Sequence, residues 1–267
     1  MSGLADPVIE HVAETGSTNS DLLARVHAAT ASGAASFPAC MLVAERQTAG
    51  RGRHGRAWHG AAGASLACSL AWPFARADLS GLSLAVGVAL ADALEPPPGA
   101  GRIGIKWPND LWLLDGDFGA AERPGRKLAG VLIETAPVAP GRVAVIGVGI
   151  NVLPLAVADA ASGVAALAEI DPAATAAKTL ARVAPALVAA MRRFESSGFA
   201  AFAERFAARD LLRGRQVVGD ADGSAVTGVA SGIDSDGALL LETARGRVRV
   251  TSGEWRLRLA VPTGSPC

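Results

Sequence analysis

The sequence predicts an α+β protein that carries a second, small β domain at its C-terminus. Up to about residue 213, apolar runs of strand length are interspersed with longer segments whose apolar residues have helical spacing. From about Gly214 the pattern changes. Five short β-rich pieces separated by Gly and Asp turns follow in under fifty residues, which is typical of a small barrel-like domain. We therefore expect one domain over residues 1–213 and a second over 214–267.

Four segments of the larger domain are expected to be helices. Thr18-Asn19-Ser20-Asp21 matches a capping box just before an apolar run, which indicates that a helix begins there. Ser80–Leu94 has apolar residues at helical spacing and ends before three prolines. Pro172–Phe194 is Ala-rich, and Pro172 suits the first turn of a helix. Phe199–Ala208 is expected to be a shorter helix that follows Pro172–Phe194.

Short apolar runs predict the strands, and the proline at position 73 is expected to end the second of them. In the larger domain the expected strands are Met41–Ala44, Ser65–Trp72, Arg102–Lys106, Leu111–Leu114, Leu128–Glu134 and Val143–Ile150. In the small domain they are Gln216–Val218, Val226–Ile233, Ala238–Glu242, Arg247–Thr251 and Trp255–Leu259. Asp115–Gly125 is expected to be a loop without a specific role, and Pro262–Cys267 a frayed end.

Composition excludes several classes of function. The chain has 25 Lys and Arg and 25 Asp and Glu residues, and this neutrality argues against nucleic acid as the main partner. Cys40, Cys68 and Cys267 form no C-x-x-C pair, which argues against a zinc site or disulfide framework and favours a reducing compartment. The longest apolar stretches, Leu82–Leu90 and Val143–Ala158, do not suit a membrane span. We expect a soluble, cytoplasmic protein.

A loop of glycines and arginines follows the first expected strand. Gly50–Gly55 satisfies G-x-G-x-x-G, but no acidic residue lies about 20 residues further on where a dinucleotide fold needs one. Arg51, Arg53 and Arg56 instead suit the binding of an anion such as a phosphate or acyl-phosphate. A solvated basic turn is the alternative. Trp58 favours the binding site, because an aromatic ring beside the loop can stack on a base.

Three further segments place polar residues at the ends of expected strands. Lys106-Trp107-Pro108-Asn109-Asp110 joins a strand-end lysine to a rigid polar turn. Arg126-Lys127-Leu128-Ala129-Gly130 places a lysine at the start of an apolar strand, where a buried ammonium would need an anionic partner. Gly147-Val148-Gly149-Ile150-Asn151 ends a buried strand with an amide. In isolation, an ordinary turn and a surface lysine remain alternatives.

Five motifs occur in one order and together resemble those of the bacterial biotin–protein ligases, which attach biotin to the biotin carboxyl carrier of acetyl-CoA carboxylase. They are Gly16-Ser17-Thr18-Asn19, Gln47-Thr48-Ala49-Gly50-Arg51-Gly52-Arg53, Lys106-Trp107-Pro108-Asn109-Asp110, Lys127-Leu128-Ala129-Gly130 and Gly147-Val148-Gly149-Ile150-Asn151. The likeness runs from about Glu14 to Leu259. It implies a mixed β-sheet flanked by helices, related to class II aminoacyl-tRNA synthetases, and a C-terminal SH3-like β-barrel.

The resemblance also implies a two-step reaction. The carboxylate of biotin attacks the α-phosphate of Mg-ATP to give biotinyl-5′-adenylate and pyrophosphate. A lysine of the biotin carboxyl carrier protein then attacks the adenylate and AMP leaves. The implied cofactors are thus ATP and Mg²⁺, with biotin as substrate.

The resemblance implies roles for individual residues. It places biotin against Ser17, Thr18, Asn19, Gln47, Arg51, Gly52, Arg53 and Lys127. It places the nucleotide against Arg53, Arg56, Trp58, Lys106, Asn109, Asn151 and Arg258. Lys127, Lys106 and Arg53 are the expected catalytic residues. No metal ligand is identified, and Asp110 is a candidate only by proximity. We expect the Gly/Arg loop to be mobile without ligand and ordered by the adenylate.

Some features depart from the family pattern or leave alternatives open. His54 stands where another basic residue is common, and the 115–125 excursion is longer than in compact members. Some members carry an N-terminal helix-turn-helix domain, for which the expected helix at residue 18 leaves no room, so no DNA binding is expected. Lipoate–protein ligation and a non-catalytic biotin- or nucleotide-responsive regulator are the competing functions. The carrier's identity and a homodimer are left open.

Overall fold

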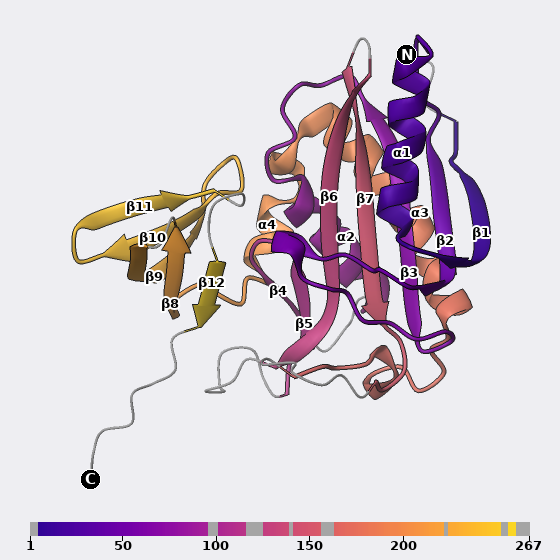
Figure 1. The fold of residues 1–267 in the computed structure, drawn as a ribbon. Coiled ribbons are helices and arrows are strands. Elements are labelled where there is room, and N and C mark those ends of the chain that lie inside the picture. Colours follow the sequence, from indigo (N-terminus) through magenta and orange to yellow (C-terminus); the bar gives the residue numbers. More distant parts are fainter. Residues whose placement is uncertain are drawn as a thin grey trace.

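The computed structural model describes residues 5–95, 101–115, 125–138, 141–155, 163–221, 224–251 and 256–259. Figure 1 shows a large sheet with helices on both faces and a smaller sheet beside one of its edges. The α+β class with a mixed sheet and a small C-terminal β domain is confirmed.

The large sheet has seven strands in the order β1-β2-β3-β7-β6-β5-β4. β1 and β2 are parallel and every other neighbouring pair is antiparallel, so the sheet is mixed. Its strands are β1 (Val8–Thr15), β2 (Cys40–Gln47), β3 (Ser65–Phe74), β4 (Ile103–Lys106), β5 (Asp110–Leu113), β6 (Arg126–Val138) and β7 (Gly141–Asn151). The outer side of β4 is covered by main-chain hydrogen bonds, because Ile105 N donates to Arg209 O and Leu211 N donates to Ile105 O. β1 forms the opposite edge.

The two faces of the large sheet pack their apolar residues against different helices. Alternate residues of a strand point to opposite faces. Val143 and Val145 of β7 accordingly pack with Leu22 and Val26 of α1 (Thr18–Ala31). The intervening residues of β7 face the main core, with α2 (Leu82–Leu94) and α3 (Ala176–Ser197). Figure 1 shows α1 on the near face and α2 and α3 behind the sheet.

The C-terminal domain is an antiparallel sheet of five strands in the order β11-β10-β9-β8-β12. They are β8 (Gln216–Ala221), β9 (Ser224–Ile233), β10 (Leu239–Thr243), β11 (Gly246–Val250) and β12 (Arg256–Leu259). Within the described residues β11 and β12 are opposite edges, so backbone pairing does not close the sheet into a barrel. The two sheets are joined by packing, because Trp107 Nε1 donates to Gly237 O at 2.9 Å and Leu239 and Leu241 belong to the main core.

The helix boundaries differ from those expected. Ser17, not Thr18, caps α1, because the Thr18 side chain is used in a buried network. α3 begins at Ala176, where Thr175 Oγ1 accepts from Lys178 N, so Pro172 lies before the helix instead of in its first turn. The segment expected as one helix over 199–208 is a 3₁₀ turn, Phe199–Ala201, followed by the short α4, Ala203–Ala207.

The strand predictions were wrong at two points. β1 was not predicted, because this edge strand is largely exposed and lacks an apolar run. Pro73 does not end β3: beyond Ala71 only β7 pairs with this strand, so a residue without an N–H is tolerated. Cys40 and Cys68 are buried free thiols, and burial raises the pKa of Cys68 to about 12. Cys267, the end 262–267 and most of the 115–125 loop lie outside the described residues. In the described chain, no helix has the length and apolarity to cross a membrane.

Candidate active site

Three alternate residues of β7 form a floor on the face of the sheet that α1 covers only in part. Beyond Val145, the residues on this face are Gly147, Gly149 and Asn151. The two glycines leave the backbone open to close approach. A Cβ at Gly147 would lie 2.5 Å from Asn19 Oδ1, and one at Gly149 would lie 2.3 Å from the Trp58 ring. Alternate residues of a strand are roughly 7 Å apart, so the floor is long enough for an extended ligand.

A buried hydrogen-bond network occupies the first end of this floor. Gln47 Oε1 accepts from Thr18 N at 2.8 Å and from Thr18 Oγ1 at 3.1 Å. Ser69 Oγ lies 2.7 Å from Thr18 Oγ1 and donates to Asn19 Oδ1 at 2.6 Å. Ser17, Thr18 and Asn19 are each less than 5 % exposed, and Ser69 is fully buried. The α1 N-terminus, the end of β2 and the middle of β3 thus form a neutral network of fixed donors and acceptors.

Glu134 of β6 connects this network to the Gly/Arg loop. Its Oε2 accepts from Asn19 Nδ2 at 3.0 Å, and its Oε1 pairs with Arg51 Nη2 at 3.0 Å. Arg51 also donates to Ser20 Oγ at 3.2 Å. Arg51 is therefore held beside the buried network by Glu134 and Ser20.

The Gly/Arg loop folds back on itself before it reaches the floor. Gly52 N donates to Arg56 O at 2.7 Å and Trp58 N to Gly50 O at 2.9 Å. A Cβ at Gly50 would lie 2.6 Å from Trp58 O, so glycine is needed there, while His54 has a left-handed φ of 55°. The turn places the Trp58 ring on Gly149, and no described residue accepts a hydrogen bond from its buried indole N–H.

Positive charges gather at the second end of the floor. Lys127 Nζ lies 2.7 Å from Asp110 Oδ1 and 5.6 Å from the centroid of the Trp58 ring. Lys106 Nζ lies 5.4 Å from the centroid of Trp112. Arg53 Nη1 donates to Asn109 Oδ1 at 3.3 Å. The motifs that contain Lys106 and Lys127 are thus brought together with the loop, although they are far apart in the sequence.

Burial and mutual repulsion perturb these cations. Burial lowers the pKa of Lys106; Asp110 opposes the shift, and Lys127, Arg56 and Arg53 add to it. Burial likewise lowers the pKa of Arg53, with Asp110 opposing. An arginine remains charged at neutral pH despite such a shift. The cluster thus has an excess of positive charge that favours a bound anion.

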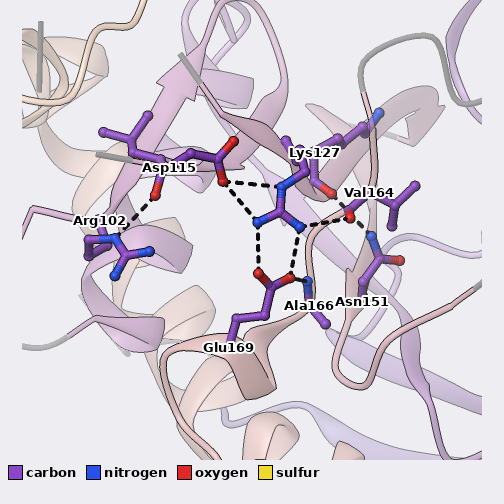
Figure 2. A network of polar contacts seen from close by, with 9 residues as sticks. Arg102, Asp115, Lys127, Asn151, Val164, Ala166 and Glu169 are labelled. Atoms are coloured by element: carbon purple, nitrogen blue, oxygen red, sulfur yellow. Dashed lines mark hydrogen bonds and ion pairs between the residues drawn. The ribbon is translucent and has the colours of Figure 1, made fainter. Parts of the chain in front are cut away.

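The two expected asparagines hold the backbone of this region. Asn109 Nδ2 donates to Val131 O at 2.8 Å. Asn151 Nδ2 donates to Lys127 O at 3.3 Å, as Figure 2 shows. Arg56 is exposed, and it acts on the pKa values of Lys106 and Arg53. Arg258 lies in β12, but its side chain is outside the described part of the chain.

Two site residues, Ser69 and Glu134, were not predicted from the sequence. A single serine in an apolar strand and a glutamate at a strand end have no local signal, because their partners lie 50 and more positions away. Alternation along β3 could only have indicated which face Ser69 occupies. Among the described residues, no group of three His, Cys, Asp or Glu side chains could hold a metal ion.

Comparison with known proteins defines the class. Residues 39–151 match the Biotin/lipoate A/B protein ligase family, and residues 213–255 match the Biotin protein ligase C terminal domain. The first match contains the floor, the loop and both lysine motifs, and the second lies in the C-terminal sheet.

Curated relatives narrow the class further. The chain is 34 % identical to the biotin--[acetyl-CoA-carboxylase] ligase of Mycobacterium tuberculosis, over 92 % of this chain and 87 % of that protein. It is 32 % identical to the protein of the same name from Paracoccus denitrificans, over 91 % and 98 %. It is 36 % identical to the bifunctional ligase/repressor BirA of Salmonella typhimurium over 75 % of this chain, a match that spans 61 % of that relative. The chain belongs to the biotin protein ligase family.

Solved structures share the fold. The biotin protein ligase from Aquifex aeolicus in complex with biotin and ATP superposes with a TM-score of 0.73 at 24 % identity, over 95 % of this chain and 99 % of that one. The Leishmania major enzyme in complex with biotinyl-5-AMP gives 0.55 at 22 % identity, over 92 % and 100 %. Both comparisons confirm the architecture of a mixed sheet with a C-terminal β domain.

Proposed function

We propose that this protein activates biotin with ATP to biotinyl-5′-adenylate and transfers the biotin to a lysine of the biotin carboxyl carrier protein of acetyl-CoA carboxylase. The observation that carries the proposal is the floor of Gly147, Gly149 and Asn151, which runs from the neutral hydrogen-bond network, where we propose the ligand pocket, to a cluster of cations. Biotin is complementary to this arrangement, because its ureido ring is neutral and the carboxylate at its other end is negatively charged.

The neutral pocket suits the ureido ring. This ring offers two N–H donors and one carbonyl acceptor. Ser17, Thr18 and Asn19 present hydroxyl and amide groups beside it, fixed by Gln47 and Ser69. Arg51, Gly52 and Arg53 close the pocket from the loop. Polar groups held in fixed orientations reject ligands that do not match them, because a mismatch leaves a buried polar group of the ligand or of the protein without a partner.

The cationic end suits the first chemical step. An oxygen of the biotin carboxylate attacks the α-phosphorus of ATP, and the bond to the bridging oxygen breaks to release pyrophosphate. Both reactants are anions, so cations must offset their repulsion and the charge that develops on the α-phosphate. We assign Lys127 to the carboxylate, and Lys106 and Arg53 to the phosphate. Arg56, Asn109, Asn151 and Arg258 are the remaining proposed nucleotide contacts.

The second step needs no covalent intermediate on the enzyme. The amine of the carrier lysine attacks the acyl carbon of biotinyl-5′-adenylate, and AMP leaves from it. The two reactants must be held together and water kept away. Trp58, on the floor beside Lys127, is placed to stack on the adenine and to shield the anhydride.

Magnesium enters this proposal as part of the substrate Mg-ATP. Mg²⁺ is commonly held by one or two carboxylates together with substrate phosphates. Asp110 lies among the cations, paired with Lys127 and acting on the pKa values of Lys106 and Arg53, which supports it as the candidate carboxylate. A single carboxylate fits an ion carried mainly by the nucleotide.

The Gly/Arg loop is proposed to become more ordered when the adenylate forms. Side-chain contacts join it to the rest of the domain, among them the Trp58 ring on Gly149, the Arg51–Glu134 pair and the hydrogen bond from Arg53 to Asn109. Limited proteolysis is the test, and biotin with ATP should protect the bonds after Arg51, Arg53 and Arg56. Equal cutting with and without the ligands would contradict the proposal.

The first experiment follows the carrier by intact mass. Purified protein, biotin, Mg-ATP and an apo biotin carboxyl carrier domain are mixed, with Lys127→Ala and Arg53→Ala variants alongside. The wild type should add one biotin and the variants little. A gain that survives both substitutions keeps the function and discards these site residues. No gain from folded protein contradicts the function.

Two other functions are tested in the same way. Lipoate ligation has support in the name of the matched family, which covers both cofactors. Selectivity for biotin over lipoate in pyrophosphate release separates the two. A regulator without catalysis would bind biotin or nucleotide but release no pyrophosphate.

The remaining expectations are part of this proposal. The domains are taken as 1–213 and 214–267, and the reaction is placed in the cytoplasm, where ATP is available. No operator binding is expected, in keeping with the neutral charge, and a salt-sensitive, sequence-specific gel shift would contradict that. Sedimentation with and without biotin and ATP measures whether a homodimer forms.

A further inference from the structure

Arg126, the residue before Lys127, contacts Asp115, Val164 and Glu169, which Figure 2 labels in one polar cluster. Its Nη2 lies 2.8 Å from Asp115 Oδ1 and 2.7 Å from Glu169 Oε2. Its Nε donates to Asp115 Oδ1 at 3.1 Å, and its Nη1 to Glu169 Oε1 at 3.2 Å and to Val164 O at 3.3 Å. One guanidinium thus joins the residues after β5, the start of β6 and the segment 163–169.

The side chain that Arg126 holds is itself fixed. Glu169 Oε1 also accepts from Ala166 N at 2.8 Å, which ties the carboxylate to its own turn. The hydrogen bond from Arg126 lowers the pKa of Glu169, so the pair is charged at neutral pH. The cluster is only about one third exposed at Arg126 and Glu169.

The ladder of the sheet holds Lys127 on one side only, and at an irregular point of the pairing. The pairing of β5 with β6 shifts register between Leu111 and Trp112, so Trp112 pairs with Lys127 and Leu128 is skipped. On the other side, the pairing of β6 with β7 ends at Ala129. Irregularities of this kind re-aim side chains and are common next to active sites.

The segment that Arg126 holds supplies the missing bonds. Lys127 N donates to Gly163 O at 3.2 Å, and Ala165 N donates to Lys127 O at 2.9 Å. Asn151 Nδ2 donates to the same carbonyl at 3.3 Å. Arg126 also packs on this segment, because a Cβ at Gly163 would lie 2.8 Å from its Cγ. The backbone of Lys127 is thus held by residues whose own place depends on Arg126.

We infer that Arg126 is a positioning residue for the reaction: it clamps residues 163–169 onto the start of β6 and so aims the Lys127 ammonium at the site. The inference rests on the proposed function for its effect on activity, but not for its effect on structure. Lysine at position 126 could not replace it, because a single ammonium cannot bind two carboxylates and a carbonyl in the planar arrangement of a guanidinium.

Arg182 provides a matched control. It pairs with one carboxylate, Asp171, at 2.9 Å, where Arg126 pairs with two, and it donates to two main-chain carbonyls, those of Ala93 and Leu94. Its side chain is 32 % exposed, against 35 % for Arg126. It lies on α3, on the other face of the sheet. Loss of either arginine should therefore cost similar stability, and only loss of Arg126 should change catalysis.

The test measures biotin-dependent pyrophosphate exchange for Arg126→Ala, Arg126→Lys and Arg182→Ala. We expect kcat to fall roughly tenfold or more in both Arg126 variants, as for a displaced catalytic group, with a smaller rise in the KM for biotin, whose carboxylate Lys127 is proposed to bind. Arg182→Ala should keep the wild-type kcat. In the double variant Arg126→Ala/Lys127→Ala, kcat should equal that of Lys127→Ala alone, because Arg126 acts through Lys127. Additive losses, or equal losses at Arg126 and Arg182, would overturn the inference.

Amide hydrogen exchange separates this inference from the proposed function. The amides of Lys127 and Ala165 should exchange faster in Arg126→Ala than in the wild type and in Arg182→Ala. This measurement does not need activity. If the wild type shows no exchange of pyrophosphate, the proposed function fails, and the amides still decide the clamp: unchanged protection in Arg126→Ala would refute it.

Discussion

Lys127 Nζ and Asp110 Oδ1 lie 2.7 Å apart, joining the start of β6 to the start of β5. The lysine side chain is 31 % exposed and the aspartate 20 %. The pair places one carboxylate among Lys127, Lys106 and Arg53, where it offsets their repulsion. Because it is partly screened by solvent, its contribution to stability is small, on the order of 1 kcal/mol or less. Its importance lies in where it holds the ammonium.

Asp110→Asn should therefore reduce activity more than stability. Without the carboxylate, Lys127 loses its anionic partner and the repulsion among the cations of the site increases. We expect kcat/KM for Mg-ATP in pyrophosphate exchange to fall about tenfold or more, with little change in Tm. Asp92→Asn is the control, since Asp92 pairs with Arg205 at 2.7 Å and is 29 % exposed. A wild-type kcat/KM in Asp110→Asn would show that the pair has no role in the reaction.

Ser69→Ala should weaken the binding of biotin. The change leaves Asn19 Oδ1 without its buried donor, which costs roughly 1–3 kcal/mol, and it releases the Thr18 hydroxyl. The KM for biotin should rise while that for ATP stays the same. Thr179→Val removes a comparably buried hydroxyl on α3 and should lower Tm without changing either constant. Isothermal titration with biotin checks the result, and unaltered affinity would exclude Ser69 from the pocket.

Gly149→Ala should displace the Trp58 ring. The added methyl would lie 2.3 Å from the ring carbon, which neither the strand nor the ring can tolerate in place. We expect a change in tryptophan fluorescence and a rise of about tenfold or more in the KM for ATP, since base–aromatic stacking contributes about 1–3 kcal/mol. Gly87→Ala is the control, because its Cβ would make only ordinary contacts at 3.5 Å. Unchanged fluorescence and KM would argue against stacking by Trp58.

Lys106 should set the alkaline limit of activity. Burial lowers the pKa of its ammonium from the ordinary value of 10.5, so the positive charge is lost at a lower pH than for an exposed lysine. If the charge stabilises the α-phosphate, kcat/KM falls as pH rises through this lowered pKa, because kcat/KM reports the free enzyme. Lys106→Arg should move the falling limb to higher pH. The full pH profile of pyrophosphate exchange measures both, and an unmoved limb would assign it to another group.

Much of the local structure could be predicted from the sequence. The apolar runs predicted β2, β3, β6 and β7, because buried strands are rich in apolar residues. β1 was not predicted, since an exposed edge strand has no apolar run. The start of α3 was predicted at Pro172 instead of Ala176, because a proline suits the first turn of a helix. The family motifs supplied most of the candidate site residues. They gave no indication of Ser69, Glu134 or Arg126, whose partners come from distant segments.

By itself the sequence determined the motifs, the class of fold and the kinds of charge available at the site. Only the tertiary structure decided how these groups face one another. The pairing of β6 with β7 places Gly130 opposite Gly149, and the shifted pairing of β5 sets Asp110 against Lys127. Local sequence encodes periodicity and propensity, which act over a few residues. Strand register and the contacts between segments depend on packing over the whole core. These contacts place the neutral network and the cation cluster at the two ends of a single floor.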